Sequence, residues 1–166
     1  MADINVSAMY DAVYEIIDEI LNPGAPPTPI KIRAGYQNIA APEKLDDMGK
    51  PEAPYISIVE IPISNSEGYP DISEWTEDSP GSTGGSQQAK DDYEATYEIH
   101  QTGGRGELLQ KVKVALNLDN IAASMNTKGI ASRRTGPTMP TYNSIEKRWG
   151  PDCMAEFIFA GSYRLA

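Results

Sequence analysis

Few residues in this chain are of the types that do chemistry. There is one histidine, His100, and one cysteine, Cys153, and they lie in different segments. A Cys–His nucleophile would require two distant segments to meet by chance, and zinc would lack the several His or Cys ligands that it needs. His100 falls on the polar face of a predicted strand, where we expect a half-exposed sheet residue rather than a catalytic base. These residues give no support for nucleophilic or zinc chemistry.

Acidic side chains are more abundant candidates. Asp91, Asp92, Glu94 and Glu98 lie close together, and the two glutamates share one face of a predicted strand. A Mg²⁺ or paired-carboxylate site, and with it a metal-dependent hydrolase, is therefore one alternative. With 24 acidic residues in 166, however, such neighbours are expected on a solvated face. The spacing of a calcium-binding loop is absent. We expect no enzymatic activity, no cofactor and no metal.

A glycine-rich turn, Gly103-Gly104-Arg105-Gly106, precedes a predicted helix, which is a position where phosphates bind in other proteins. The turn has neither the Lys-Ser/Thr ending of a P-loop nor the spacing of a dinucleotide-binding fingerprint. A structural turn is the favoured interpretation, because glycine adopts backbone angles that a side chain forbids. The charge of Arg105 is unfavourable at a helix N-terminus. A carboxylate on a neighbouring subunit is one candidate partner that would explain an arginine at this position.

That turn joins a strand to a helix. Apolar residues alternate with polar ones from Tyr93 to Ile99, which predicts a strand with one buried face. From Leu108 to Leu116 the apolar residues recur at helical spacing instead, which predicts a short amphipathic helix. The stretch is therefore interpreted as a scaffold of strand, turn and packed helix.

A second helix is predicted at the N-terminus, where Val6–Leu21 carries one broad apolar stripe. Asn5 or Ser7 could cap its start, and Asn22-Pro23-Gly24 ends it. Further strands are predicted from alternating patterns, at Ile30–Tyr36, Ala53–Ile63, Gly129–Thr135 and Met154–Leu165. The second of these has apolar residues on both faces, which predicts an inner strand covered on both sides, and Pro62 limits its ladder.

These elements predict an α+β fold. We expect a mostly antiparallel sheet of about four to five strands, with two main helices packed on one face, because the helices do not alternate regularly with the strands. At 166 residues the chain fits a single domain, residues 1–166, with a sizeable core. No internal repeat is visible.

The segment Ser64–Lys90 stands apart from this pattern. It is rich in Ser, Gly, Pro and acidic residues, and it predicts a long acidic loop. Such a loop is either a flexible excursion or an arm that becomes ordered against a partner. In the second case Tyr69, Ile72 and Trp75 are its apolar anchors.

Composition and charge restrict the partners. The net charge of −10 makes binding to a nucleic-acid backbone unfavourable, although DNA could pass beside such a surface without being held. The single cysteine fits synthesis in a reducing, intracellular compartment. No signal peptide is visible and no apolar run is long enough to cross a bilayer, so we expect a soluble protein made in a cytoplasm.

The whole layout resembles the bacteriophage tail-terminator family, also called neck-terminator or tail-completion proteins. The resemblance covers nearly the full chain. It lies in the N-terminal helix MYDAVYEIIDEIL, the strand APYISIVEIPI, the acidic loop, the block YEIHQTGGRGELLQKVKVAL, and the closing segments GIASRRTGPTMPTYNSIEKRW and MAEFIFAGSYRL. The YEIHQTGGRG block with its helix and the final FIFAGSYRL strand are its most specific parts.

The resemblance implies a small α+β subunit that forms a ring, expected to be hexameric, at the phage neck. Such a ring ends the tail tube and joins it to the head connector, with DNA passing through its lumen and a sheath protein as a further partner if the tail is contractile. The expected location is the virion neck, and the host cytoplasm during assembly. The candidate subunit-interface residues are Arg105, Arg133, Arg134, Arg148, Trp75 and Tyr69. Besides the hydrolase, the alternative is a monomeric cytoplasmic adaptor that docks through the acidic loop.

Overall fold

The protein was analysed as a computed structural model, which describes residues 3–35, 54–66, 72–81, 83–143 and 148–165. Within these residues the chain forms three helices and seven strands that share one mixed sheet. This confirms the predicted α+β class and the mostly antiparallel sheet, while it adds a third helix and strands beyond the four to five expected.

Two long antiparallel strands form the spine of the sheet. They are β4 (Gly85–Thr102) and β7 (Arg148–Leu165), which pair from Ala89↔Leu165 to Gln101↔Cys153. Shorter strands follow the outer edges of the spine, and all pairs except β1–β2 are antiparallel. The outer edge of β4 carries β2 (Tyr55–Ser66) and β3 (Ile72–Glu77), with β1 (Lys31–Ala34) beyond β2; the outer edge of β7 carries β5 (Ile130–Thr135) and β6 (Met139–Asn143).

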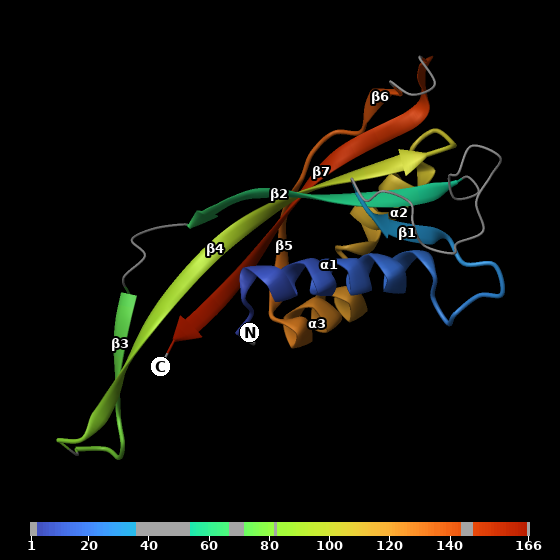
Figure 1. Ribbon diagram of the computed structural model, residues 1–166. Coiled ribbons are helices and arrows are strands. Elements are labelled where there is room, and N and C mark those ends of the chain that lie inside the picture. The colour runs from blue at the N-terminus through green and yellow to red at the C-terminus, as the bar shows by residue number, and fades with distance from the viewer. Residues whose placement is uncertain (1–2, 36–53, 67–71, 82, 144–147, 166) are drawn as a thin grey trace.

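All three helices cover the same face of this sheet (Figure 1). They are α1 (Val6–Leu21), α2 (Glu107–Ala115) and α3 (Asp119–Lys128). The bounds of α1 agree with the predicted helix. Of its two candidate caps, Asn5 is the N-cap residue, since its side-chain oxygen accepts a hydrogen bond from the Ala8 N–H at 2.8 Å.

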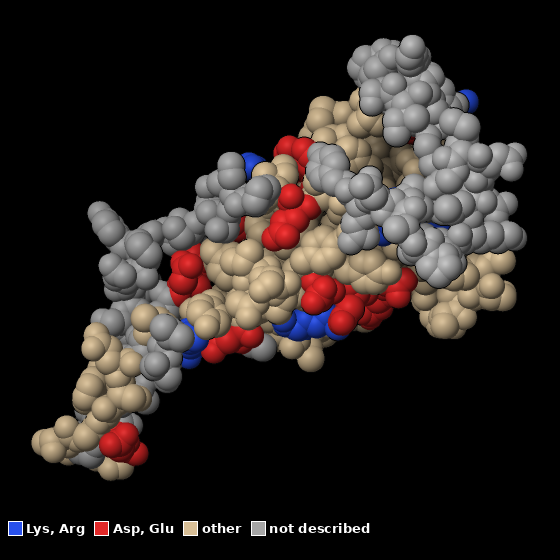
Figure 2. Space-filling model, viewed as in Figure 1, with Lys and Arg blue, Asp and Glu red and all other residues tan. Residues whose placement is uncertain are grey.

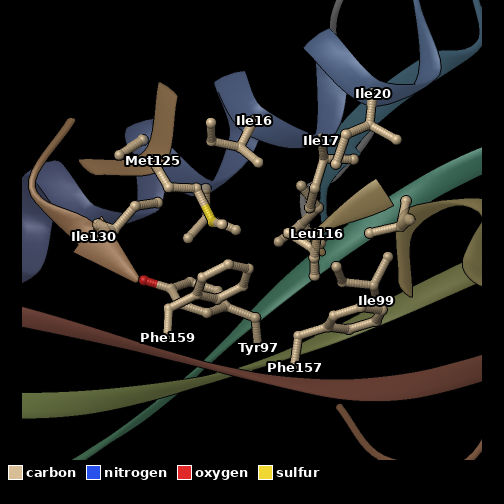
Figure 3. Close-up of a cluster of buried hydrophobic side chains, with 14 of the residues drawn as sticks. Ile16, Ile17, Ile20, Tyr97, Ile99, Leu116, Met125, Ile130, Phe157 and Phe159 are labelled. Atoms are coloured by element: carbon tan, nitrogen blue, oxygen red, sulfur yellow. The ribbon is translucent and has the colours of Figure 1, made fainter. Parts of the chain in front are cut away.

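The core lies between the helices and the spine (Figure 3). Aromatic side chains of the spine point up toward the isoleucines of α1, and Phe159 meets Tyr97 edge-on with ring centroids 6.0 Å apart. The strand pattern predicted for the centre of β4 is confirmed: alternate residues from Tyr93 to Ile99 are buried, and those between them are partly exposed. The fully buried larger side chains include Met9, Ile16, Ile17, Ile56, Ile58, Tyr97, Ile99, Leu109, Ile130, Phe157 and Phe159.

The segment 64–90 differs from the predicted long loop. It contains the end of β2, the whole of β3 and the beginning of β4. Pro62 does not end β2; its pairing with β4 is interrupted between Ile61 and Asn65 and then resumes to Ser66. The sequence pattern missed β3 because a ladder is made by backbone groups, which pair without a buried apolar face.

We call β3 and the residues of β4 that pair with it, Gly85–Lys90, the arm. Of the β4 residues in the arm, only Ala89 and Lys90 also pair with β7. The rest of the arm is a two-stranded ribbon that extends beyond the spine and away from the helices (Figure 1). Tyr69, which was expected in this region, lies outside the described residues.

Candidate functional site

The junction between β4 and α2 is held by a buried glutamine. The side chain of Gln101 is fully buried, and its amide oxygen accepts hydrogen bonds from the Leu108 and Leu109 N–H groups at 3.0 and 3.4 Å. Its amide nitrogen donates to the Gly103 carbonyl at 2.7 Å. Gln101 thereby satisfies helix N-terminal donors that Gly106, the N-cap residue, has no side chain to reach.

The glycines of the turn are required by its geometry. Gly103, Gly104 and Gly106 have φ angles of 81°, 82° and 93°, in the left-handed region. The Arg105 N–H donates to the Glu107 carboxylate at 2.7 Å, and the pKa of Glu107 is lowered by hydrogen bonds from backbone N–H groups. These donors are bonded to side chains of the protein itself, so the turn is built as a structural element and not as a phosphate cradle.

The candidate carboxylates and the histidine have partners within the sheet. The Glu98 carboxylate lies 3.2 Å from His100 Nε2, and the histidine side chain is 31% exposed, as expected for a half-exposed sheet residue. The Glu94 carboxylate lies 3.8 Å from Arg133 Nε. Across the described part of the chain, no group of three or more His, Cys, Asp or Glu residues is placed to hold a metal. The single thiol, Cys153, is buried, which raises its pKa.

Arg133 and Arg134 lie on β5, at the edge of the sheet. They line a hollow of about 340 Å³, which we call the β5 groove. All six residues of β5 line it, together with side chains from the end of α2 and from α3. The other lining residues are Lys113, Leu116, Asn117, Ala122, Met125 and Asn126.

The groove is basic in an acidic protein. Its lining includes three cations, Lys113, Arg133 and Arg134, and no carboxylate. On the face of the molecule drawn in Figure 2, by contrast, acidic side chains clearly outnumber basic ones among the described residues. The predicted pair of arginines therefore lines a hollow in the structure. Lys113 is the third basic residue of that lining, and the sequence analysis did not identify it. A lysine on the flank of a helix carries no signal that it faces a strand edge.

Arg105 lies apart from that pair. It is exposed and lines a second hollow, of about 250 Å³, next to the start of β6. The two hollows adjoin along the β5–β6 edge, where Lys113 of the first donates to the Thr138 hydroxyl of the second at 2.9 Å. The structure thus places three of the predicted arginines along one edge of the sheet. The backbone of Arg148 pairs with Asn143 in the β6–β7 hairpin.

Trp75 lies on the arm, opposite Gln87, and is 61% exposed. A large aromatic side chain in this position buries little area within its own chain, although aromatic residues are among the commonest anchors of protein interfaces. The arm and the β5 groove lie on opposite sides of the spine. The structure therefore places Trp75 on one surface, and Arg105, Arg133 and Arg134 along another.

No family model matches this chain, and no curated protein matches it. Among the described residues, no helix has the length and apolar character needed to span a membrane.

Proposed function

We propose that this protein is a structural subunit of a tailed bacteriophage, and that six copies form a ring at the neck, which ends the tail tube and joins it to the head connector. The observation that carries the proposal is the arrangement of edges in the sheet. Among the described strands, β1, β3 and β5 each pair with another strand on one side only. Unpaired edges are templates for pairing with another chain, and contacts between identical subunits can cover them.

The chemistry of the described residues supports a structural role. The strand–turn–helix junction uses its polar groups to hold itself together, and the candidate carboxylates Glu94 and Glu98 face basic partners in the sheet. A protein built in this way acts through its surfaces. The tube protein, the connector and, in a contractile tail, the sheath are the partners that the proposal assigns to those surfaces.

The charge supports the location at the neck. With a net charge of −10, the subunit offers little attraction to a phosphate backbone. A ring of such subunits would let DNA pass through its lumen without holding it. The ring would be found in the virion, and its subunits in the host cytoplasm during assembly.

Imaging of assembled particles tests the proposal. Particles labelled with an antibody against this chain are expected to carry the label at the head–tail junction, and reconstruction there is expected to show a six-fold ring. Purified particles that lack the chain would refute the proposal. Light scattering measures the oligomeric state. If it shows a monomer both in solution and in the presence of tail tubes, the result would instead favour an adaptor that docks through its arm.

A further inference from the structure

We propose that the β5 groove receives strand β3 of a neighbouring copy, so that the sheet continues from one subunit into the next. This inference deepens the proposed ring, and it rests on that proposal for the identity of the partner as a second copy. The proposed ring does not say which surfaces of neighbouring subunits meet; this inference names them as the β5 groove of one copy and strand β3 of the next.

The two strands match in length and in what they leave unpaired. Both β3 and β5 have six residues. In the described sheet, β3 pairs only with β4, and β5 pairs only with β7. Each therefore has an edge of backbone donors and acceptors that no described strand covers, which is what strand addition uses, although the row on β5 is interrupted by the register shift between Ser132 and Arg134. Because every residue of β5 lines the groove, a strand added along β5 would run beside the groove, and its side chains could reach into it.

The two surfaces are also complementary in charge. The groove lining carries Lys113, Arg133 and Arg134 and no carboxylate, although Glu94, outside the lining, lies 3.8 Å from Arg133 Nε. The sequence of β3 contributes Glu74 and Glu77, and Asp78 follows directly. Opposite charges on the two partners favour this pairing and fix its register, while they disfavour β5 against β5 or β3 against β3.

The topology requires the two strands to come from different copies. In each subunit β3 lies on the outer edge of β4 and β5 lies on the outer edge of β7, so both spine strands separate them. A chain cannot pair its own β3 with its own β5 without dissolving the spine. The contact is therefore head-to-tail, and contacts of this kind close into rings or extend into filaments.

Trp75 gives the inserted strand an apolar anchor. It lies in the middle of β3 and is 61% exposed. At the groove, the apolar part of the lining includes Leu116 and Met125, which are themselves largely buried. An exposed tryptophan meeting an apolar floor with a charged rim is a common arrangement at the centre of protein interfaces.

Cross-linking between two single-cysteine variants tests the contact. Both carry Cys153→Ala to remove the native thiol; one also carries Ser73→Cys or Thr76→Cys on β3, and the other Ser132→Cys or Thr135→Cys on β5. With a flexible bis-maleimide, a covalent dimer is expected in the mixture of the two and in neither sample alone. A β5-side partner with Gln110→Cys, which lies on α2 outside the groove, is the matched control and is expected to give no dimer.

Charge exchange gives a second, independent measurement. Arg134→Glu is expected to weaken self-association about tenfold or more by sedimentation, because it places like charges together. Glu77→Arg in the same chain is expected to restore it, whereas Lys111→Glu, an exposed change on α2 outside the groove, is expected to leave it unchanged.

The outcomes separate this inference from the proposed function. A ring that forms at the neck without any β3–β5 cross-link would overturn the inference and leave the function standing. Cross-links within open filaments, in a protein missing from phage particles, would support the inference and refute the neck role. If neither association nor cross-linking is seen for the free protein at its highest soluble concentration or in the presence of tail tubes, the inference is wrong.

Discussion

A single strand, β4, contains two regions of opposite character. Its central part, Tyr93–Gln101, lies between β2 and β7 under the helices, and alternate side chains are almost fully buried. Its first part, Gly85–Lys90, belongs to the arm and pairs mainly with β3. The two parts belong to one continuous strand, so the difference between them lies in their side chains and neighbours and not in secondary structure.

The comparison separates stability from recognition. The central part supplies tyrosine and isoleucine side chains to the core, where burial drives folding. The arm is a two-stranded ribbon, which is marginally stable by itself in water. We therefore expect substitutions in the centre to change the free energy of unfolding, and substitutions in the arm to change association.

The largest expected effect is in the core. Phe159→Ala removes a fully buried ring that packs against Tyr97, and should lower the free energy of unfolding by about 3–5 kcal/mol. Denaturant unfolding followed by circular dichroism measures this. If Phe159→Ala lowers the free energy of unfolding by no more than an ordinary surface substitution does, the spine is not the stabilising centre of the fold.

A smaller loss is expected at the junction. Gln101→Leu keeps the volume but leaves the Leu108 N–H without its acceptor, which should cost about 1–3 kcal/mol. Gln110→Leu, on the exposed side of α2, is the matched control and should change stability little. Equal unfolding midpoints for the two variants would show that the buried amide does not stabilise the start of α2.

Two glycines with the same backbone conformation sharpen the comparison. Gly104 and Gly81 have φ angles of 82° and 79°, so alanine is strained at both by about 1–2 kcal/mol. At Gly104 the added methyl group would also meet Gln101 and Glu107, whereas at Gly81 nothing lies within 4 Å. Gly104→Ala should lower global stability, and Gly81→Ala, in the connection between the two strands of the arm, should affect only the arm, which can open locally. Hydrogen exchange distinguishes a loss of global stability from local opening of the arm. Equal losses of global stability in the two variants would contradict the division between the centre of β4 and the arm.

The smallest effect on stability is expected for Trp75, on the exposed arm. Trp75→Ala should change the free energy of unfolding by less than about 0.5 kcal/mol, because the side chain is 61% exposed. The same variant should weaken association, which analytical ultracentrifugation measures. A large loss of stability with unchanged association would reverse the roles assigned to the two regions.

Sequence patterns predicted the buried parts of the fold well. Val6–Leu21 and the alternation from Tyr93 to Ile99 were both identified, because burial of one face imposes a period on the sequence. The arm and β6 carry no such period, since neither packs beneath the helices. Their strands could not be separated from loop by composition.

The candidate interface was predicted in part. The pair Arg133-Arg134 was visible as a basic cluster, and Trp75 as an aromatic residue in a polar segment. Neither Lys113 nor Gln101 could be found in this way. Their roles depend on which strand edge lies beside α2 and on how the turn closes, and both are long-range properties of the sheet.

The continuity of β4 has a mechanical consequence. A pull on the arm along β4 would be transmitted directly to its thirteen paired positions with β7, from Ala89 to Gln101. In that direction the ladder is loaded in shear, so many hydrogen bonds share the force at once. A pull that peels β3 away from β4 instead breaks the pairs one after another. The subunit should thus resist tension along its spine far better than it resists peeling at its tip.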